Sequence, residues 1–158
     1  MKSEIFEFIP QKPVVESDAV ITSGFGFRTR PDGVEEFHNG IDIACMSEKH
    51  TLIYSVWHGT VEQYGFHAGW GWHVWIRDSV ADNHFSVYMH MDRLSPVLRA
   101  GGVVDAGEQI GVMGNTGLSR GVHLHYSICP RIDLVSKEDN RYVGEYGIKT
   151  VEKLYKGA

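Results

Sequence analysis

Two short patterns in this 158-residue chain combine side chains that can bind a metal ion. His38 and Asp42 lie four residues apart, and His123 and His125 lie two residues apart. In a strand, residues i and i+2 project from the same face with Cα atoms about 7 Å apart, so His123 and His125 are expected to enter one pocket together. One of them can then bind a metal while the other acts on whatever the metal holds.

The spacing of His38 and Asp42 requires a bend in the chain. Strict extension would separate their Cα atoms by about 13 Å, too far for both to ligate one ion through bonds of about 2 Å. The intervening dipeptide Asn39-Gly40 is the one best able to take a positive φ, and it is unfavourable inside a helix. The sequence therefore predicts a bent strand at this point rather than a helix.

Two histidines and one aspartate make three protein ligands and leave one position open, which is typical of a catalytic rather than a structural zinc site. A carboxylate ligand without a thiolate suits hydrolysis at a polarised carbonyl. His90, which ends an apolar run, is a further candidate, although by itself it also fits a strand-end residue. His123 by itself also fits a residue that orients a ligand. The remaining histidines have no partner in the sequence and are interpreted as surface or packing residues: His50, His58, His67, His73 and His84.

Short strands must position these side chains, because from Ile21 onward the chain consists of β-rich runs separated by turn residues. Runs such as 52–57, 72–76 and 122–128 recur with a spacing typical of strands joined by turns. This pattern favours an antiparallel β domain over βαβ units. Near the C-terminus, apolar residues at helical spacing predict a short helix over 146–156.

Composition excludes several classes of protein. With 15 basic and 20 acidic residues, the formal net charge is −5, and no Lys/Arg-rich run occurs. Nucleic-acid binding through phosphate contacts is therefore not expected. No apolar run approaches the ~20 residues of a membrane span. Cys45 and Cys129 lack metal-finger spacing and lie among apolar neighbours, so they are interpreted as reduced core cysteines, with a single disulfide as the alternative.

In order and spacing, the motifs resemble those of the lysostaphin/LytM type of zinc endopeptidase, which cleaves the peptides of peptidoglycan. The resemblance extends from about Thr22 to Cys129 and rests on the segments 23–28, 37–44, 59–61, 88–91, 104–111, 114–117 and 119–126. It implies that His38, Asp42 and His125 are the ligands of one Zn²⁺ per chain. It also implies that His90 and His123 are catalytic histidines that flank the bound water.

The resemblance implies a mainly β fold, a single small antiparallel β domain with an open zinc groove and a short C-terminal helix. This agrees with the strand pattern. Residues 1–18 are expected to form an extended leader and residues 19–130 the zinc metallopeptidase domain. Residues 131–158 are expected to form a C-terminal extension whose short helix packs on the same domain.

Two segments depart from the family pattern, and a third has two possible roles. The loop 46–53 is longer and more polar than the Gly-Thr-Pro-Val stretch common in relatives. Some members have a tyrosine upstream of the first ligand that stabilises the tetrahedral intermediate, but residues 27–37 contain none; Arg28 is present there. The aromatic segment 65–72 fits either the packing of a β-hairpin or a groove rim that contacts substrate.

The expected function is a zinc-dependent endopeptidase that hydrolyses peptide bonds in peptidoglycan stems or cross-bridges, including a phage or prophage lysis enzyme or a virion-associated one. The alternatives are a zinc endopeptidase with a non-wall peptide substrate, an inactive binding or regulatory member, and an iron oxygenase that also uses two histidines and a carboxylate. The N-terminus lacks the apolar stretch of a signal peptide. We therefore expect synthesis in the cytoplasm and action on the wall after lysis, virion delivery or export. A chain trimmed of its signal or of a larger protein fits equally well, and the oligomeric state is left open.

Overall fold

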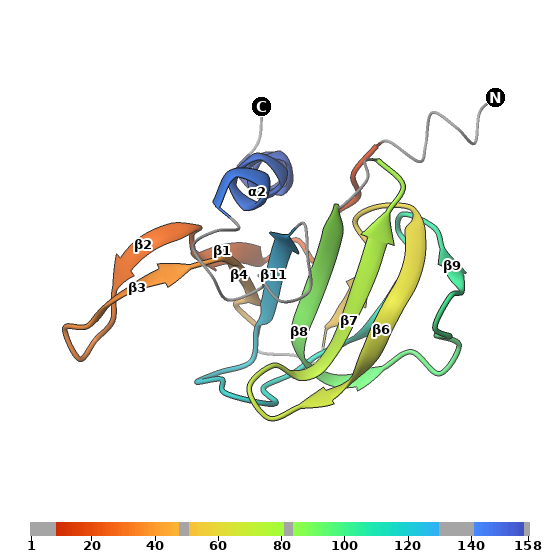
Figure 1. The fold of residues 1–158 in the computed structure, drawn as a ribbon. Coiled ribbons are helices and arrows are strands. Elements are labelled where there is room, and N and C mark those ends of the chain that lie inside the picture. The colour runs from red at the N-terminus through yellow and green to blue at the C-terminus, as the bar shows by residue number, and fades with distance from the viewer. Residues whose placement is uncertain (1–8, 48–50, 81–83, 130–140, 157–158) are drawn as a thin grey trace.

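Antiparallel strands make up most of the structure, a computed structural model that describes residues 9–47, 51–80, 84–129 and 141–156 (Figure 1). Every pairing between the strands of these residues is antiparallel, which confirms the β fold predicted from the spacing of the β-rich runs. The strands are β1 (Ala19–Ser23), β2 (Gly26–Thr29), β3 (Glu35–His38), β4 (Gly40–Cys45), β5 (Leu52–Tyr54), β6 (Gly59–His67), β7 (Gly71–Asp78), β8 (Phe85–Leu94), β9 (Val103–Val104), β10 (Gln109–Met113) and β11 (Leu124–Cys129).

Two of the three candidate ligands, Asp42 of β4 and His125 of β11, lie on neighbouring strands of one large sheet, whereas His38 ends β3 of the separate two-stranded sheet β2–β3. The order of the large sheet is β1-β4-β11-β8-β7-β6-β9, and β10 pairs with both β5 and β8. The register places His125 of β11 opposite Asp42 of β4 on one side and opposite Met89 of β8 on the other. Strand pairing thus brings together three segments that are far apart in the sequence.

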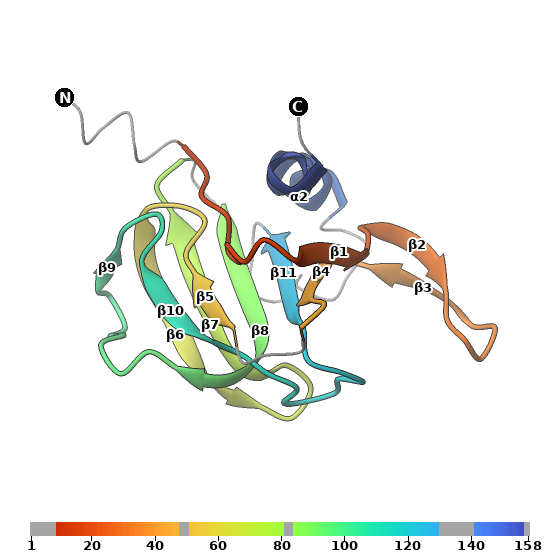
Figure 2. The ribbon, with the colours of Figure 1, turned by 180° about the vertical axis from the view of Figure 1, so that it is seen from behind.

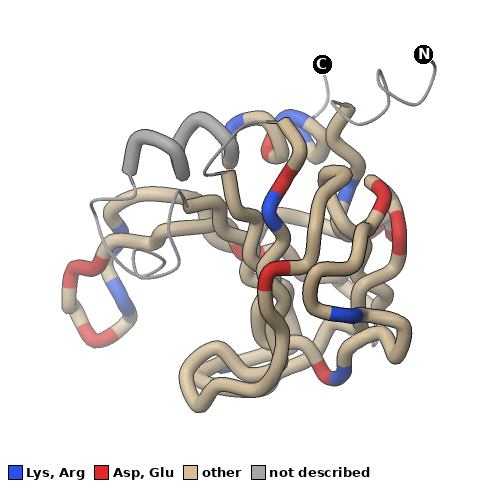
Figure 3. Tube along the Cα trace, turned by 45° about the vertical axis from the view of Figure 1, so that its right-hand side comes forward, with Lys and Arg blue, Asp and Glu red and all other residues tan. Residues whose placement is uncertain are grey.

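The hairpin β2–β3 extends away from this sheet, beyond β1 and β4 (Figures 1 and 2). Phe37 packs edge-to-face against Phe25 and Phe27, with ring centroids 5.3 and 5.1 Å apart. Such aromatic pairs stabilise a two-stranded hairpin that has little other core. Acidic and basic residues lie together on this hairpin (Figure 3).

The centre of the sheet is buried on both faces, because a run of successive residues in β8 and every residue of β11 are buried, rather than alternate residues. One face packs into the main core around Ile41 and Tyr126, and the other into a smaller cluster that includes Trp75. Cys45 belongs to the first cluster and Cys129 to the second. Both cysteines are buried and neither forms a disulfide, in agreement with the prediction of reduced core cysteines.

The helix α2 (Arg141–Lys156) packs on the sheet through the fully buried side chains of Ile148 and Val151. The Tyr155 hydroxyl donates to the carbonyl of Val14 at 2.8 Å and accepts from its N–H at 3.0 Å. The helix covers the segment predicted from the apolar spacing and begins five residues earlier. Among the described residues, no helix is long and apolar enough to cross a membrane.

Parts of three predicted segments lie outside the described residues. They are 1–8 of the predicted leader, 48–50 of the polar loop, which include His50, and 131–140 of the predicted C-terminal extension.

Candidate metal centre and catalytic cleft

The chain bends between β3, which ends at His38, and β4, which begins at Gly40, as the spacing of the candidate ligands predicts. The bend does not use the positive φ that Asn39-Gly40 is suited to take, because neither residue is among those with a positive φ. A Cβ at Gly40 would lie 2.3 Å from the carbonyl oxygen of Tyr126 and 2.9 Å from Nε2 of His125. Glycine is therefore needed because β11 and a candidate ligand approach the backbone closely.

The carboxylate of Asp42 is the meeting point of the candidate ligands. Its Oδ1 lies 3.0 Å from Nδ1 of His125 and 3.3 Å from Nε2 of His38, and these two nitrogens are 3.2 Å apart. Within the described part of the chain, these three residues form a group whose ligand atoms all lie within 4.8 Å of one another. The structure thus brings together the three residues that the sequence singled out.

The donor set of this group fits a zinc ion. Nδ1 of His38 must donate to the carbonyl of Gly24 at 2.7 Å, because a carbonyl only accepts, so its Nε2 carries a lone pair that points at the group. Two imidazole nitrogens and one carboxylate oxygen then converge on one point, and these are ligands that zinc accepts.

Electrostatics hold the group in the protonation states that a cation requires. Burial alone would raise the pKa of Asp42, but the interactions with the neighbouring imidazoles of His125 and His38 outweigh it and hold that pKa well below its usual range. Burial lowers the pKa of His125. The carboxylate is therefore ionised and the imidazole of His125 is neutral, as metal ligation demands.

His90 lies at a β-bulge in β8. Val74 of β7 pairs with Tyr88 and Trp72 pairs with Met91, so two residues of β8 oppose one residue of β7. His90 has a φ of 64° and is the one non-glycine residue with a positive φ among those described. Because of the extra residue, Met91 packs in the same core cluster as Tyr88, whereas strict alternation would place it on the opposite face. At the bulge, His90 therefore does not follow the alternation of side chains between the two faces of the sheet.

Neighbouring backbone groups hold His90 in this strained position. Its N–H donates to the carbonyl of Trp70 at 2.8 Å, and its Nδ1 donates to the carbonyl of Thr116 at 2.7 Å. The side chain is 8% exposed, and burial is the main cause that lowers its pKa to about 4. Its imidazole is consequently neutral at physiological pH, with the lone pair on Nε2.

His123 stands next to the candidate ligands with the same tautomer. Its Nδ1 donates to the carbonyl of Gly121 at 2.8 Å, and its Nε2 lies 3.6 Å from Oδ1 of Asp42. The rings of His90 and His123 are 5.0 Å apart between centroids. The two histidines that the sequence identified as catalytic candidates are therefore close together and beside the ligand group.

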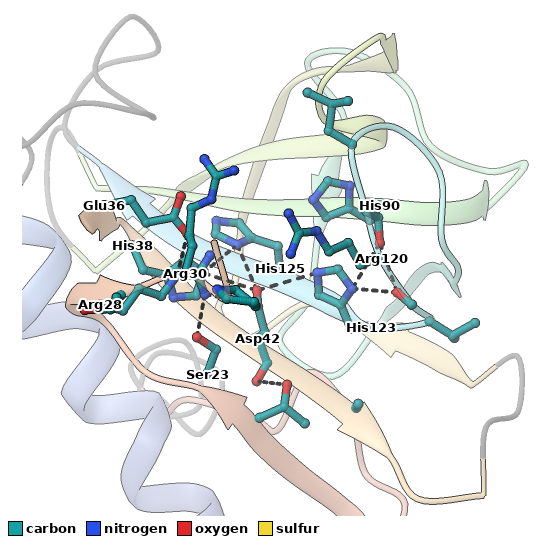
Figure 4. A pocket seen from close by; sticks show the side chains of 18 residues that line it. Ser23, Arg28, Arg30, Glu36, His38, Asp42, His90, Arg120, His123 and His125 are labelled. Carbon is teal, nitrogen blue, oxygen red and sulfur yellow. Dashed lines mark hydrogen bonds and ion pairs between the residues drawn. The ribbon is translucent and has the colours of Figure 1, made fainter. Parts of the chain in front are cut away.

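All five residues line one cleft of about 1030 Å³ (Figure 4). Arg28, Arg30 and Glu36 line it from the hairpin β2–β3 and its turn, and Leu118 to Val122 line it from the loop before β11. Arg28 contacts Glu36 at 2.7 Å and Asp42 at 3.6 Å, and it also donates to Ser23. Arg28 thus stands beside the ligand group, where the sequence offered it as the residue present in place of a tyrosine.

The aromatic segment 65–72 does not line the cleft. Its tip instead supports the site, because Trp70 accepts the N–H of His90 and Gly69 accepts the N–H of Leu118 at 2.9 Å. The hairpin-packing interpretation of this segment is the one that the structure favours. The other described histidines have hydrogen-bonding partners away from the ligand group, in agreement with their interpretation: His58 with Ser79, His67 with the backbone of Gly69 and Trp70, His73 with Gly71, and His84 with Asp78.

Sequence reasoning missed the backbone carbonyls of Gly24, Thr116 and Gly121, which fix the tautomers of three site histidines. A carbonyl is common to every residue, so no residue type could have revealed these contacts. It also missed Arg30 and Arg120, which line the cleft.

Comparison with known proteins gives a family for this chain. The model of Peptidase family M23 matches residues 36–137. The chain is 36% identical over 107 residues to the DD-carboxypeptidase/endopeptidase Mpg of Neisseria meningitidis, across 67% of this chain and 23% of that protein. The chain spans between 18% and 31% of the length of the curated relatives that it matches.

Solved structures agree with this match. The catalytic domain of the prophage-encoded M23 protein EnpA of Enterococcus faecalis is 34% identical, with a TM-score of 0.62 over 75% of this chain and 85% of that one. A zinc-containing peptidase of Vibrio cholerae is 29% identical, with a TM-score of 0.66 over 77% of this chain and 37% of that one. The match to the family model includes most of the chain and all five site residues, and the chain belongs to peptidase family M23.

Proposed function

We propose that this chain is a zinc-dependent endopeptidase that hydrolyses peptide bonds in the stems or cross-bridges of peptidoglycan. The observation that carries the proposal is the convergence of His38, Asp42 and His125 in the cleft, with His90 and His123 beside them. The Neisseria relative is named a DD-carboxypeptidase/endopeptidase, which supports peptide hydrolysis. The Vibrio structure is described as a zinc-containing peptidase, which supports zinc as the metal.

In this proposal, His38, Asp42 and His125 hold one zinc ion. A zinc ion held by these residues would supply a Lewis acid that polarises the scissile carbonyl and lowers the pKa of water toward ~7. The three side chains belong to β3, β4 and β11, whose positions are fixed by the sheet and by the hairpin that continues into it. The ligands are thus preorganised rather than carried on loops.

His123 is the residue that we assign to proton transfer. Its Nδ1–H is bound to Gly121, so its Nε2 can accept a proton from the attacking water. The imidazolium that forms lies 3.6 Å from the Asp42 carboxylate, which stabilises its charge. His123 can then give the same proton to the leaving amine. The ring of His90 lies 5.0 Å from that of His123, and its Nε2 can accept a hydrogen bond that orients the water or the substrate amide.

The cleft suits an extended peptide. Its two walls come from separate elements, the hairpin β2–β3 on one side and the loop 118–122 on the other. A backbone that lies between them meets the ligands and both histidines at the floor. Wall peptides rich in small residues obstruct such an approach least.

The proposal is tested by metal analysis and wall digestion. The purified chain should contain one zinc per molecule, and a chelator should abolish hydrolysis until zinc is returned. Digestion of purified peptidoglycan should release free amino groups without new reducing sugar ends. New reducing ends would show a glycosidase, and hydrolysis of only non-wall peptides would support the alternative substrate.

Substitutions separate ligands from proton-transfer groups. His125→Ala should lose both zinc and activity, whereas His123→Ala should keep zinc and lose ~10²–10⁴-fold in rate. His58→Ala, which removes a histidine bonded to Ser79 outside the cleft, is the matched control and should change neither. If His123→Ala released zinc while His125→Ala retained it, the assignment of this pair would be reversed.

A further inference from the structure

Of the described residues, three arginines line the cleft, and two of them are neutralised by carboxylates of the hairpin β2–β3 and its turn. Arg28 pairs with Glu36 at 2.7 Å, and Arg30 pairs with Asp32 at 2.7 Å. Arg120 differs from both, because among the described residues it forms neither a hydrogen bond nor an ion pair. Its guanidinium is therefore the uncompensated positive charge on the cleft wall.

Arg120 is close to the residues that act on the scissile bond. It lies in the loop that begins at Leu118 and leads into His123, and the next residue, Gly121, holds the His123 ring. In Figure 4 its side chain points into the pocket, toward the side where Asp42 and His125 lie. Leu118, 83% exposed on the same wall, offers apolar contact to a small alkyl group.

We infer, resting on the function proposed above, that Arg120 binds a free carboxylate of the substrate within one or two residues of the scissile bond. The planar guanidinium fork matches a carboxylate and can bind it through two parallel hydrogen bonds. Peptidoglycan stems carry such carboxylates, at their C-terminus and on residues linked through a side chain, whereas a bridge of glycine or alanine carries none. The preferred substrate is therefore a carboxylate-bearing stem rather than a neutral bridge.

The test compares carboxylate and carboxamide forms of one peptide. The shortest wall fragment that the zinc-loaded chain cleaves is synthesised with each carboxylate in turn converted to carboxamide. One of these changes should lower kcat/KM about tenfold, as expected for an exposed charge-assisted contact. Arg120→Gln should lower kcat/KM equally on the carboxylate peptide and leave the amidated one unchanged, so the two effects are not additive. Arg120→Lys should recover part of the loss.

A control variant shows whether the effect is specific to Arg120. Arg77→Gln, which removes an arginine paired with Glu62 outside the cleft, should leave the preference intact. If Arg120→Gln retains the wild-type preference for the carboxylate, or the wild type shows none, the inference is overturned.

A binding measurement separates this inference from the proposed function. Equilibrium binding of a synthetic peptidoglycan stem peptide, in carboxylate and carboxamide forms, to the zinc-loaded His123→Ala variant should favour the carboxylate form about tenfold, and Arg120→Gln in that background should remove the preference. Carboxylate-dependent binding without turnover by the wild-type chain would contradict the hydrolase and keep the inference. Equal binding of both forms would overturn it.

Discussion

The floor of the cleft and its walls are built differently. The floor consists of paired strands, and His38, His90 and His125 there are no more than 8% exposed. The walls consist of a projecting hairpin and a loop, whose side chains, including Phe27 at 66% and Leu118 at 83%, face solvent. The chemistry therefore depends on strand register and close packing, while substrate contacts depend on elements that can change without disturbing the sheet.

The largest loss of zinc binding and activity is expected at Gly40, where the floor of the cleft is packed too closely to accept a Cβ atom. Gly40→Ala should abolish zinc binding and activity, because its Cβ would overlap the Tyr126 carbonyl and approach Nε2 of His125. Zinc content, hydrolysis and urea unfolding measure the outcome. Gly24→Ala is the matched control, since nothing lies within 4 Å of the added methyl group and the carbonyl that holds His38 remains. Retention of zinc by Gly40→Ala would show that the floor can relax.

The bulge at His90 should separate stability from rate. His90→Ala and His90→Gly should both lose ~10²–10⁴-fold in rate, since both remove the imidazole. His90→Gly should nevertheless be more stable than His90→Ala by about 1 kcal/mol, because glycine accepts a φ of 64° without strain. Denaturant unfolding checks the order, and equal stabilities would mean that the backbone conformation changes with the side chain.

A buried carboxylate at the far end of the sheet should make stability depend on pH. Burial raises the pKa of Asp78 to about 6, against the opposing effect of its hydrogen bond with His84. A raised folded-state pKa stabilises the fold below the unfolded value of about 4, and this contribution is lost as the pH rises to about 6. Relative to Asp78→Asn, the wild type should therefore lose on the order of 2 kcal/mol between pH 4 and pH 7.

The control for this prediction is Asp105→Asn, whose carboxylate is exposed. Its unfolding free energy should follow the wild type across the same pH range. A constant difference between the wild type and Asp78→Asn would show that Asp78 titrates alike in the folded and unfolded chains.

The smallest effect is expected on the outer wall. Glu36→Gln removes a half-exposed ion pair with Arg28 and should change the unfolding free energy by less than about 1 kcal/mol. Its zinc content should stay at the wild-type level, because the ligand geometry does not depend on this contact. Loss of zinc in this variant would contradict the division between floor and walls.

The strands and the candidate ligand group could be predicted because both are visible in the sequence as patterns of residue type. Alternating and apolar runs with glycine turns indicate strands, and His38, Asp42, His123 and His125 are rare enough in combination to be noticed. The bend was predictable from the reach of the chain, since His38 and Asp42 could both contact one ion only if the chain bends between them. The reason for Gly40 was not, because its Cβ would meet β11, more than 80 residues away.

The orientation of the histidines could not be read from the sequence. It depends on backbone carbonyls and, at His90, on a bulge that only strand register reveals. Arg120 was missed for a related reason: its distinction is that it has no partner among the described residues, and partners are known only after the chain is folded. These features are properties of the assembled sheet and loops.

The two cysteines lie on opposite faces of one sheet, in separate apolar clusters. A thiol becomes reactive toward a labelling reagent only when its surroundings open, so each cysteine reports the opening of its own face. Cys45 follows the face that packs into the main core beneath the ligand strand β4. Cys129 follows the smaller cluster around Trp75. The labelling rates of these two natural cysteines therefore measure how often each face of the sheet opens, without any engineered probe.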